Sequence, residues 1–185
     1  AGVGGQGILL ASDILCNVCM AAGLDVKKSE VHGMAQRGGC VTSHVRYGER
    51  VHSPLARKNE VDILVSFERM DTLRYLDYVK ESGTVIINTE EIYPAAVNLG
   101  ASPYPTNVLE TVRSFFDTVI SIDAATLADR AGNIKTVNTV LLGALSSCMD
   151  IDTALWEKTL HESFPQKLID VNWKAFCLGR NVQTP

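Results

Sequence analysis

The sequence lacks any apolar run that approaches the roughly 18 consecutive residues a membrane-spanning helix needs. It also lacks a basic run, and its 17 Lys and Arg against 21 Asp and Glu leave a net charge of −4. A mildly acidic chain without a local basic cluster is a poor ligand for polyanions. We therefore predict neither a membrane protein nor a nucleic-acid-binding protein.

The cysteines are odd in number, which argues against a disulfide framework; the five residues are Cys16, Cys19, Cys40, Cys148 and Cys177. Four of them lie in apolar, helix-like surroundings, as reduced cysteines of cytoplasmic proteins do. Cys16-x-x-Cys19 has no second pair at zinc spacing, so we predict two core residues rather than a metal or redox site. No signal peptide is visible, but the sequence opens on Ala1-Gly2-Val3 inside a motif, so a preceding piece or leader stays open.

Several catalytic signatures are also absent from the sequence. It contains no Gly-x-Ser-x-Gly motif and no lysine-bearing phosphate loop. It contains no Gly-Asp-Gly with paired asparagines for thiamine diphosphate, and no run of four cysteines for an iron–sulfur cluster. The scattered carboxylates are interpreted as caps or surface charges rather than an acid–base pair; they are Asp71, Glu90, Glu91 and Asp123. The chain therefore shows no catalytic constellation of its own.

Hydrophobic periodicity predicts strands that alternate with helices in one domain over 1–185. The predicted strands are 26–31, 40–47, 61–67, 84–88 and 119–122. Gly48-Glu49-Arg50 is predicted to turn into a short returning arm at Val51-His52, which adds an antiparallel element. Beyond Thr136 the pattern is helical throughout. These features predict an α/β fold, three-layer α/β/α, with a mostly parallel, mixed central sheet and a helical C-terminal third.

The first motif is Gly2-x-Gly4-x-x-Gly7, which directly precedes a predicted helix over 8–22. This spacing permits a tight strand-to-helix turn and a close approach of a pyrophosphate to the helix N-terminus. A dinucleotide site also needs an acidic residue about 20 residues further on, for which Glu30 is the candidate. Three interpretations stay open: dinucleotide binding, a tight packing turn, and backbone N–H groups that hold another anion.

A second motif runs from His32 to Gly39 and combines an imidazole, an amide, a guanidinium and glycines in eight residues. Its Arg37 could hold a carboxylate, phosphate or carbonyl through the fork of guanidinium donors. We predict a loop that contacts a ligand or a partner subunit, with a solvated surface turn as the alternative. A third segment, Asn138-Thr139-Val140-Leu141-Leu142-Gly143, opens a helix for which we predict Asn138 as the N-cap.

Taken together and in this order, the three segments resemble the gamma-type subunit of the 2-oxoacid:ferredoxin oxidoreductases. The His-Gly-Met-Ala-Gln-Arg-Gly-Gly form is most similar to the indolepyruvate branch, and the resemblance covers nearly the whole chain. It implies a fold like domain III of pyruvate:ferredoxin oxidoreductase. It also implies an enzyme complex that decarboxylates a 2-oxoacid, passes electrons to ferredoxin and transfers the acyl group to coenzyme A.

The resemblance further implies a cytoplasmic, cofactor-free subunit, with thiamine diphosphate, Mg and 4Fe-4S clusters on a larger partner. Carried over by position, a glycine turn comprises Gly4, Gly5, Gln6 and Gly7, and an Arg-Gly-Gly loop comprises Gln36, Arg37, Gly38 and Gly39. With His32 and Asn138 these residues are our candidate ligand or subunit contacts, and no catalytic or metal-binding residue is predicted. The strand expected before Gly2 is the one departure from the family pattern.

Two other classes of function stay open at this point. One is a free-standing NAD(P)-binding, Rossmann-like dehydrogenase, which would need the glycine turn to be occupied and a carboxylate on the ribose. The other is a regulatory or scaffold module that binds a small anion without chemistry. An arylpyruvate such as indolepyruvate is the expected 2-oxoacid if the chain is a subunit of the oxidoreductase.

Overall fold

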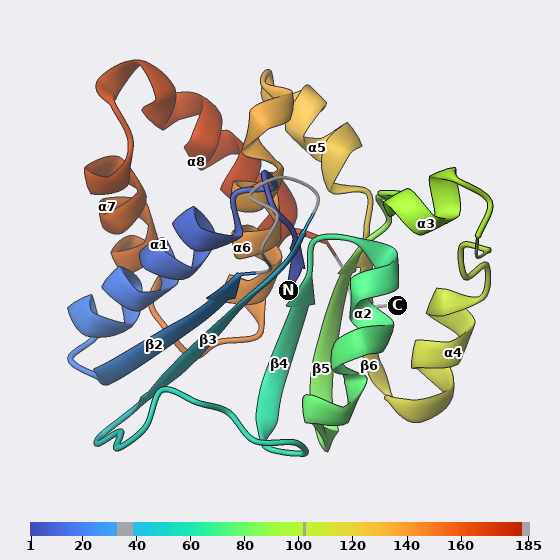
Figure 1. Ribbon diagram of the computed structural model, residues 1–185. Helices are drawn as coiled ribbons and strands as arrows, with labels where there is room; N and C mark the ends of the chain where they lie inside the picture. Colours follow the sequence, from blue (N-terminus) through green and yellow to red (C-terminus); the bar gives the residue numbers. More distant parts are fainter. Residues whose placement is uncertain (33–38, 102, 183–185) are drawn as a thin grey trace.

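The computed structural model describes residues 1–32, 39–101 and 103–182 (Figure 1). The strands are β1 (Gly2–Val3), β2 (Asp25–His32), β3 (Cys40–Gly48), β4 (Val61–Ser66), β5 (Val79–Asn88) and β6 (Thr118–Ile122). The α-helices are α1 (Ile8–Ala21), α2 (Arg69–Tyr75), α3 (Ala95–Asn98), α4 (Val108–Phe115), α5 (Ala124–Ala131), α6 (Val137–Ser147), α7 (Thr153–Ser163) and α8 (Gln166–Arg180). Short 3₁₀ turns at Leu76–Tyr78 and Ile134–Thr136 follow α2 and precede α6.

The strands form two three-stranded groups that meet at Ala1. In one group β3 pairs antiparallel with both β1 and β2, and in the other β4, β5 and β6 run parallel. The Ala1 nitrogen donates to the Val65 carbonyl at 2.8 Å, and Phe67 N–H donates to the Ala1 carbonyl at 2.9 Å. These two bonds have the pattern of a parallel ladder. The strand order is therefore β2-β3-β1-β4-β5-β6, with β3 alone reversed among the described strands, and the mixed, mostly parallel sheet is confirmed.

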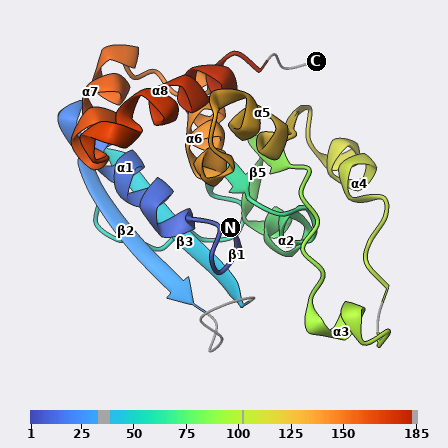
Figure 2. The same ribbon diagram turned by 90° about the horizontal axis from the view of Figure 1, so that it is seen from above.

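Apolar side chains alternate between the two faces of the sheet and form two separate cores. Ile86, Ile120 and Ile122 join a cluster with α1, α5, α6, α7 and α8, whereas Val85, Ile87 and Val119 join a cluster with α4. Both figures show α2 on the opposite face of the sheet from α1 and α6 (Figures 1 and 2). Because a buried parallel strand is covered on both sides, this arrangement gives the predicted three layers.

The helical C-terminal third is also confirmed. Asp152 caps α7 by accepting the Ala154 N–H at 2.9 Å, and Gly132 ends α5 in the left-handed conformation at φ +111°. Trp156 of α7 and Phe176 of α8 are fully buried, with ring centroids 5.5 Å apart. Cys16 and Cys19 are buried in α1, as expected of core residues.

Two local predictions were wrong. Val51-His52 forms no returning strand: β3 pairs antiparallel with β1 and with the whole length of β2. The Val51 N–H instead donates to the Asp25 carboxylate at 2.8 Å, which fixes this connection at the start of β2. The strand predicted over 84–88 begins earlier than expected, because β5 starts at Val79 with an irregular register against β4 and includes Ser82 and Gly83.

No helix in the described part of the chain is long and apolar enough to cross a bilayer.

Candidate functional site

The candidate site lies at the carboxyl edge of the parallel strands. The glycine turn Gly4–Gly7 follows β1 at this edge, and β2 also ends here at His32. From β1 the chain leaves through α1 toward β2, whereas from β4 it leaves through α2 toward β5. In open α/β sheets, ligands bind where neighbouring strands send the chain to opposite faces in this way, so we place the candidate site at this edge.

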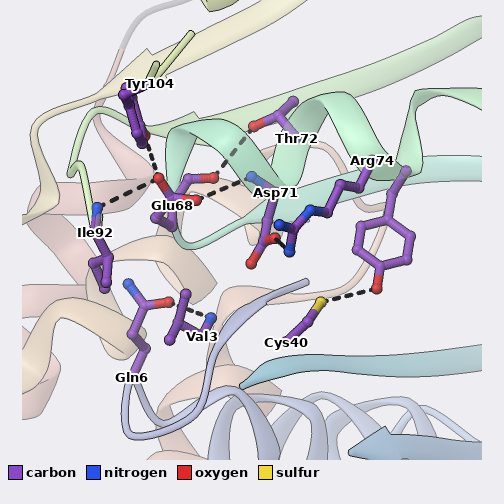
Figure 3. Close-up of polar contacts among 10 residues, drawn as sticks. Val3, Gln6, Cys40, Glu68, Asp71, Thr72, Arg74, Ile92 and Tyr104 are labelled. Atoms are coloured by element: carbon purple, nitrogen blue, oxygen red, sulfur yellow. Dashed lines mark hydrogen bonds and ion pairs between the residues drawn. The ribbon is translucent and has the colours of Figure 1, made fainter. Parts of the chain in front are cut away.

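Gln6 joins the glycine turn to the ends of β4 and β5. Its Oε1 accepts the Val3 N–H at 2.8 Å (Figure 3), and its Nε2 donates to the Phe67 carbonyl at 2.9 Å. The same Nε2 lies 3.1 Å from a carboxylate oxygen of Glu90. Gln6 therefore holds the glycine turn against the ends of β4 and β5. Both the oxygen and the nitrogen of its side-chain amide are hydrogen-bonded within the protein.

Gly7 brings the first and third motifs into contact. It has a φ of +79°, and a Cβ at this position would lie 2.9 Å from Asn138 Nδ2. Asn138 exposes only 6% of its surface, and its Oδ1 accepts the Thr139 N–H at 3.0 Å. Its Nδ2 makes no hydrogen bond among the described residues. Only glycine satisfies both the backbone angle and the close approach of this amide.

The prediction that Asn138 caps its helix was wrong. Helix α6 begins at Val137 with Thr136 at the N-cap, because a 3₁₀ turn leads directly into the helix. Asn138 is thus a buried residue of the first turn, and its amide is free to face the glycine turn. Asn138 stays a predicted ligand or subunit contact, and the structure adds that its amide lies beside Gly7.

The end of the second motif also reaches the glycine turn. The Gly4 N–H donates to the Gly39 carbonyl at 2.8 Å, next to the start of β3. The His32 backbone ends β2 in register with Val41. Gln36, Arg37 and Gly38 lie outside the described residues. The structure therefore brings together Gly4, Gly7, Gly39 and Asn138 from three separate segments of the sequence.

The N-terminus of α1 lies at this edge of the sheet and has no side-chain cap. Gly7, its N-cap, has no side chain to satisfy the first amides, and the first turn carries no acidic residue. Gly5 has a φ of +108°, and space is open where its Cβ would be. Unsatisfied N–H groups and the helix dipole favour negative charge at such a terminus. The turn, with the Asn138 amide beside it, can accept an anionic group.

Sequence reasoning missed a buried carboxylate, Glu68, beside this turn. Glu68 is fully buried and caps α2, with its Oε2 accepting the Asp71 N–H at 3.0 Å. Its Oε1 accepts a hydrogen bond from the Tyr104 hydroxyl and lies 3.4 Å from the Ile92 N–H (Figure 3). An acidic residue between a buried strand and an amphipathic helix is a capping pattern that could have indicated this role.

The carboxylates that we interpreted as caps or surface charges differ in their surroundings. Asp123 caps α5 as predicted, and its hydrogen bonds to Thr126 lower the pKa of its carboxyl. Asp71 is instead buried, with one oxygen 2.7 Å from Arg74 and the other without a partner. Burial raises the pKa of the Asp71 carboxyl, and the Arg74 guanidinium opposes that shift. Glu91 is paired with Arg69 at the surface of the same edge.

The fold argues against a dinucleotide site with Glu30 on the ribose. In dinucleotide-binding folds the strand that carries this acidic residue lies next to β1. Here the reversed β3 separates β2 from β1, and Glu30 lies in register with Ser43 and is paired with Lys28. Within the described residues no group of three or more His, Cys, Asp or Glu side chains could hold a metal ion.

Comparison with known proteins gives consistent matches over nearly the whole chain. Residues 1–182 match the family described as pyruvate ferredoxin/flavodoxin oxidoreductase. Indolepyruvate oxidoreductase subunit IorB of Thermococcus kodakarensis is 40% identical over 96% of this chain and 91% of its own. The gamma subunit of keto/oxoacid ferredoxin oxidoreductase from Geobacter sulfurreducens is similar in fold, with a TM-score of 0.70, 21% identity, and 96% and 92% of the two chains covered.

A third match is to part of a larger chain. The 2-oxoglutarate:ferredoxin oxidoreductase of Magnetococcus marinus, solved with 2-oxoglutarate, coenzyme A and succinyl-CoA bound, has a TM-score of 0.71 at 20% identity. The match covers 98% of the present chain and 29% of that chain, so the same fold occurs there within a longer polypeptide. The extent of the family match and the 40% identity together show that this chain belongs to the pyruvate ferredoxin/flavodoxin oxidoreductase family.

Proposed function

We propose that this chain is the small subunit of a cytoplasmic 2-oxoacid:ferredoxin oxidoreductase whose substrate is indolepyruvate or another arylpyruvate. The identity to an indolepyruvate oxidoreductase subunit over nearly both full lengths is the observation that carries this proposal. In this proposal the complex converts the 2-oxoacid and coenzyme A to acyl-CoA and CO2, and it passes the electrons to ferredoxin. Thiamine diphosphate, Mg and the 4Fe-4S clusters belong to a larger partner subunit.

This chain's own contribution would be binding and orientation rather than bond-making. The uncapped N-terminus of α1 and the Asn138 amide beside Gly7 offer hydrogen-bond donors at the carboxyl edge of the sheet. Coenzyme A carries phosphate groups, which are the anions such a helix terminus favours. We infer that the glycine turn holds a phosphate of coenzyme A, and that Arg37 with Gly38 and Gly39 faces the partner subunit or the same ligand.

Co-expression with the proposed larger partner subunit tests the proposed function. We expect the two chains to purify together and to reduce ferredoxin with indolepyruvate and coenzyme A, while this chain alone has no activity. Pyruvate and 2-oxoglutarate are assayed as alternative substrates. The kcat/KM for indolepyruvate should exceed both of theirs, and the 2-oxoacid with the highest value is assigned as the substrate. Turnover by the isolated chain, or purification without any partner, would contradict the proposal.

The Asn138→Ala variant tests the role of the glycine turn. Because the amide would lose one hydrogen bond to a charged phosphate, we expect the KM for coenzyme A to rise about tenfold. The KM for the 2-oxoacid should stay unchanged, since that substrate would bind on the partner. Asn17→Ala is the matched control, because Asn17 is exposed in the middle of α1. Equal KM values for coenzyme A in both variants would show that Asn138 does not contact this ligand.

A further inference from the structure

Positive charge is concentrated in the arm that consists of β2, β3 and the connection from β3 to β4. Residues 25–58 carry seven Lys and Arg against three Asp and Glu, a net charge of +4. The other residues carry ten against eighteen, a net charge of −8. The cations of the arm are spread along the sequence, so they form no basic run. The antiparallel pairing of β2 with β3 brings some of them together on one face.

The face of the arm that points away from α1 presents basic and apolar side chains. Lys28 is ion-paired with Asp13 of α1, so the alternation of side chains along β2 places Lys27 and Val31 on the opposite face. Lys27 exposes 46% of its side chain, and Val31 exposes 55% of its surface. Helix α1 packs on β2, and Figure 2 shows α1 and α7 on the same side of this strand. Lys27 and Val31 therefore lie on a face of β2 that is open to a partner.

Two cations lie directly opposite each other on this face. Lys27 is in register with Arg46, and residues in register project from the same side of an antiparallel pair. Like charges at such positions repel each other and destabilise the free chain. Asp25 lies 2.7 Å from Lys27 Nζ and offsets one of the two charges. Among the described residues Arg46 has no carboxylate partner, and it donates to the Leu55 carbonyl at 3.1 Å.

Arg57 extends the same surface along the connection to β4. It is exposed and lines a surface hollow together with Arg46, Leu55 and Glu60. Glu60 is the carboxylate of this hollow, but the described part of the chain contains no ion pair between it and either arginine. Leu55 exposes 54% of its surface, and exposed arginine next to apolar side chains is typical of protein–protein interfaces. Together these side chains form a basic face, which comprises Lys27, Val31, Arg46, Leu55 and Arg57.

The charge of the basic face indicates the kind of partner that it fits. A symmetric contact between two copies of this chain would place two basic faces against each other, which complementary interfaces avoid. Contact between the basic face of one copy and the acidic remainder of another is heterologous and leads to open filaments unless it closes into a ring. Nucleic acid fits poorly, because the whole chain is acidic and the exposed Val31 and Leu55 offer nothing to phosphates. An acidic surface on a different protein is the partner that fits.

We propose that the basic face docks on an acidic surface of the larger partner subunit. This inference rests on the proposed function, which supplies that partner. Carboxylates of the partner would neutralise the facing Lys27 and Arg46 and pair with Arg57, while Val31 and Leu55 would be removed from water. Complementary charges of this kind speed the association of two proteins and fix their relative orientation.

Charge reversal in the co-expressed complex tests the proposal. Arg46→Glu combined with Arg57→Glu should raise the Kd for the larger partner subunit about a hundredfold, measured by mass photometry on the diluted complex. Because Arg46→Glu places an opposite charge across from Lys27, the variant should fold at least as stably as the original chain. Arg113→Glu combined with Arg130→Glu is the matched control. These arginines are exposed on α4 and α5 and the net charge changes equally, so the Kd should stay within about threefold.

The salt dependence of the Kd provides the second measurement. An increase in NaCl from about 50 to about 300 mM should weaken the original complex about tenfold, since salt screens charges at the rim of an interface. Arg46→Gln combined with Arg57→Gln should reduce this salt effect to less than about threefold, because two of the charges are gone.

Three outcomes would overturn the proposal, and they have different meanings. If the original chain forms no complex with the larger partner subunit, the proposed function fails and this inference fails with it. If the original complex is active and the chain with Glu at 46 and 57 binds as tightly as the control, this inference alone fails. If the original chain binds a single-stranded RNA and the reversed variant does not, while the complex is unchanged, the basic face is a nucleic-acid site instead.

Discussion

The Gly143→Ala variant is expected to lose about 3 kcal/mol or more of its free energy of unfolding, although alanine is the better helix former. In an open helix the same change would add roughly 1 kcal/mol. Here a Cβ on Gly143 would lie 2.0 Å from the Phe176 carbonyl oxygen and 2.8 Å from the Arg180 nitrogen. Both atoms are backbone atoms of α8, so no side chain can rotate away, and the two helices must separate.

The contact is reciprocal, which makes the crossing of α6 and α8 intolerant of any side chain. A Cβ on Gly179 would lie 1.9 Å from the Val140 carbonyl oxygen, so each helix presents a glycine to the backbone of the other. Separation of the helices would open the largest core cluster around Trp156 and Phe176. We expect Gly179→Ala to be destabilising to a similar extent, and the double variant to lose less than the sum, because one separation relieves both clashes.

Urea unfolding followed by far-UV circular dichroism measures the effect. Gly48→Ala is the matched control, because Gly48 ends β3 with nothing within 4 Å of its Cβ position, and its stability should change by no more than about 0.5 kcal/mol. A Gly143→Ala chain as stable as the original would mean that α6 and α8 are further apart than described.

The strands whose apolar residues run without interruption were predictable from the sequence. Leu64, Val85 and Ile120 lie within such runs, and a strand buried on both faces leaves no other environment for them. Strand β2 was harder, because Lys27 and Lys28 interrupt its pattern, and these lysines are satisfied by Asp25 and Asp13. The alternation of apolar and polar residues within a strand also does not show which strand pairs with it. We therefore predicted an antiparallel arm after the turn at Gly48, whereas β3 pairs with β2.

The candidate site was predictable as three motifs but not as one place. Glycine spacing indicated a turn before α1, yet nothing in the sequence states that Gly39 and Asn138 meet it. Asn138 was misinterpreted because asparagine is a common N-cap, while the helix begins after a 3₁₀ turn that local propensity does not reveal. Glu68 was missed because an isolated acidic residue gives no sign of burial, which depends on segments far away in the chain.

The Glu68→Ala variant is expected to have the second large effect, a loss of about 3 to 5 kcal/mol in the free energy of unfolding. Removal of one partner from a buried, charge-assisted network leaves the others without acceptors. The Asp71 and Ile92 amides and the Tyr104 hydroxyl all direct their hydrogens at this carboxylate. The Glu68 carboxylate thereby joins the N-terminus of α2 to both ends of the segment between β5 and α4. This segment carries α3, which projects away from the helices around the sheet (Figure 2).

The Glu68→Gln variant separates hydrogen bonding from simple space filling. Glutamine keeps the shape and one acceptor oxygen, but its amide nitrogen would face a donor, so we expect a smaller loss of about 1 to 2 kcal/mol. Glu81→Gln, at an exposed position of β5, should change the stability by less than about 0.5 kcal/mol. Limited proteolysis provides an independent measurement. Because Glu68→Ala loses the hydrogen bonds to Ile92 and Tyr104, we expect the segment around the exposed Leu99 to be the first site of cleavage in this variant. If Glu68→Ala and Glu81→Gln unfold at the same urea concentration, the buried carboxylate does not hold this edge of the sheet together, and the fixed path of the connection must come from apolar contacts alone.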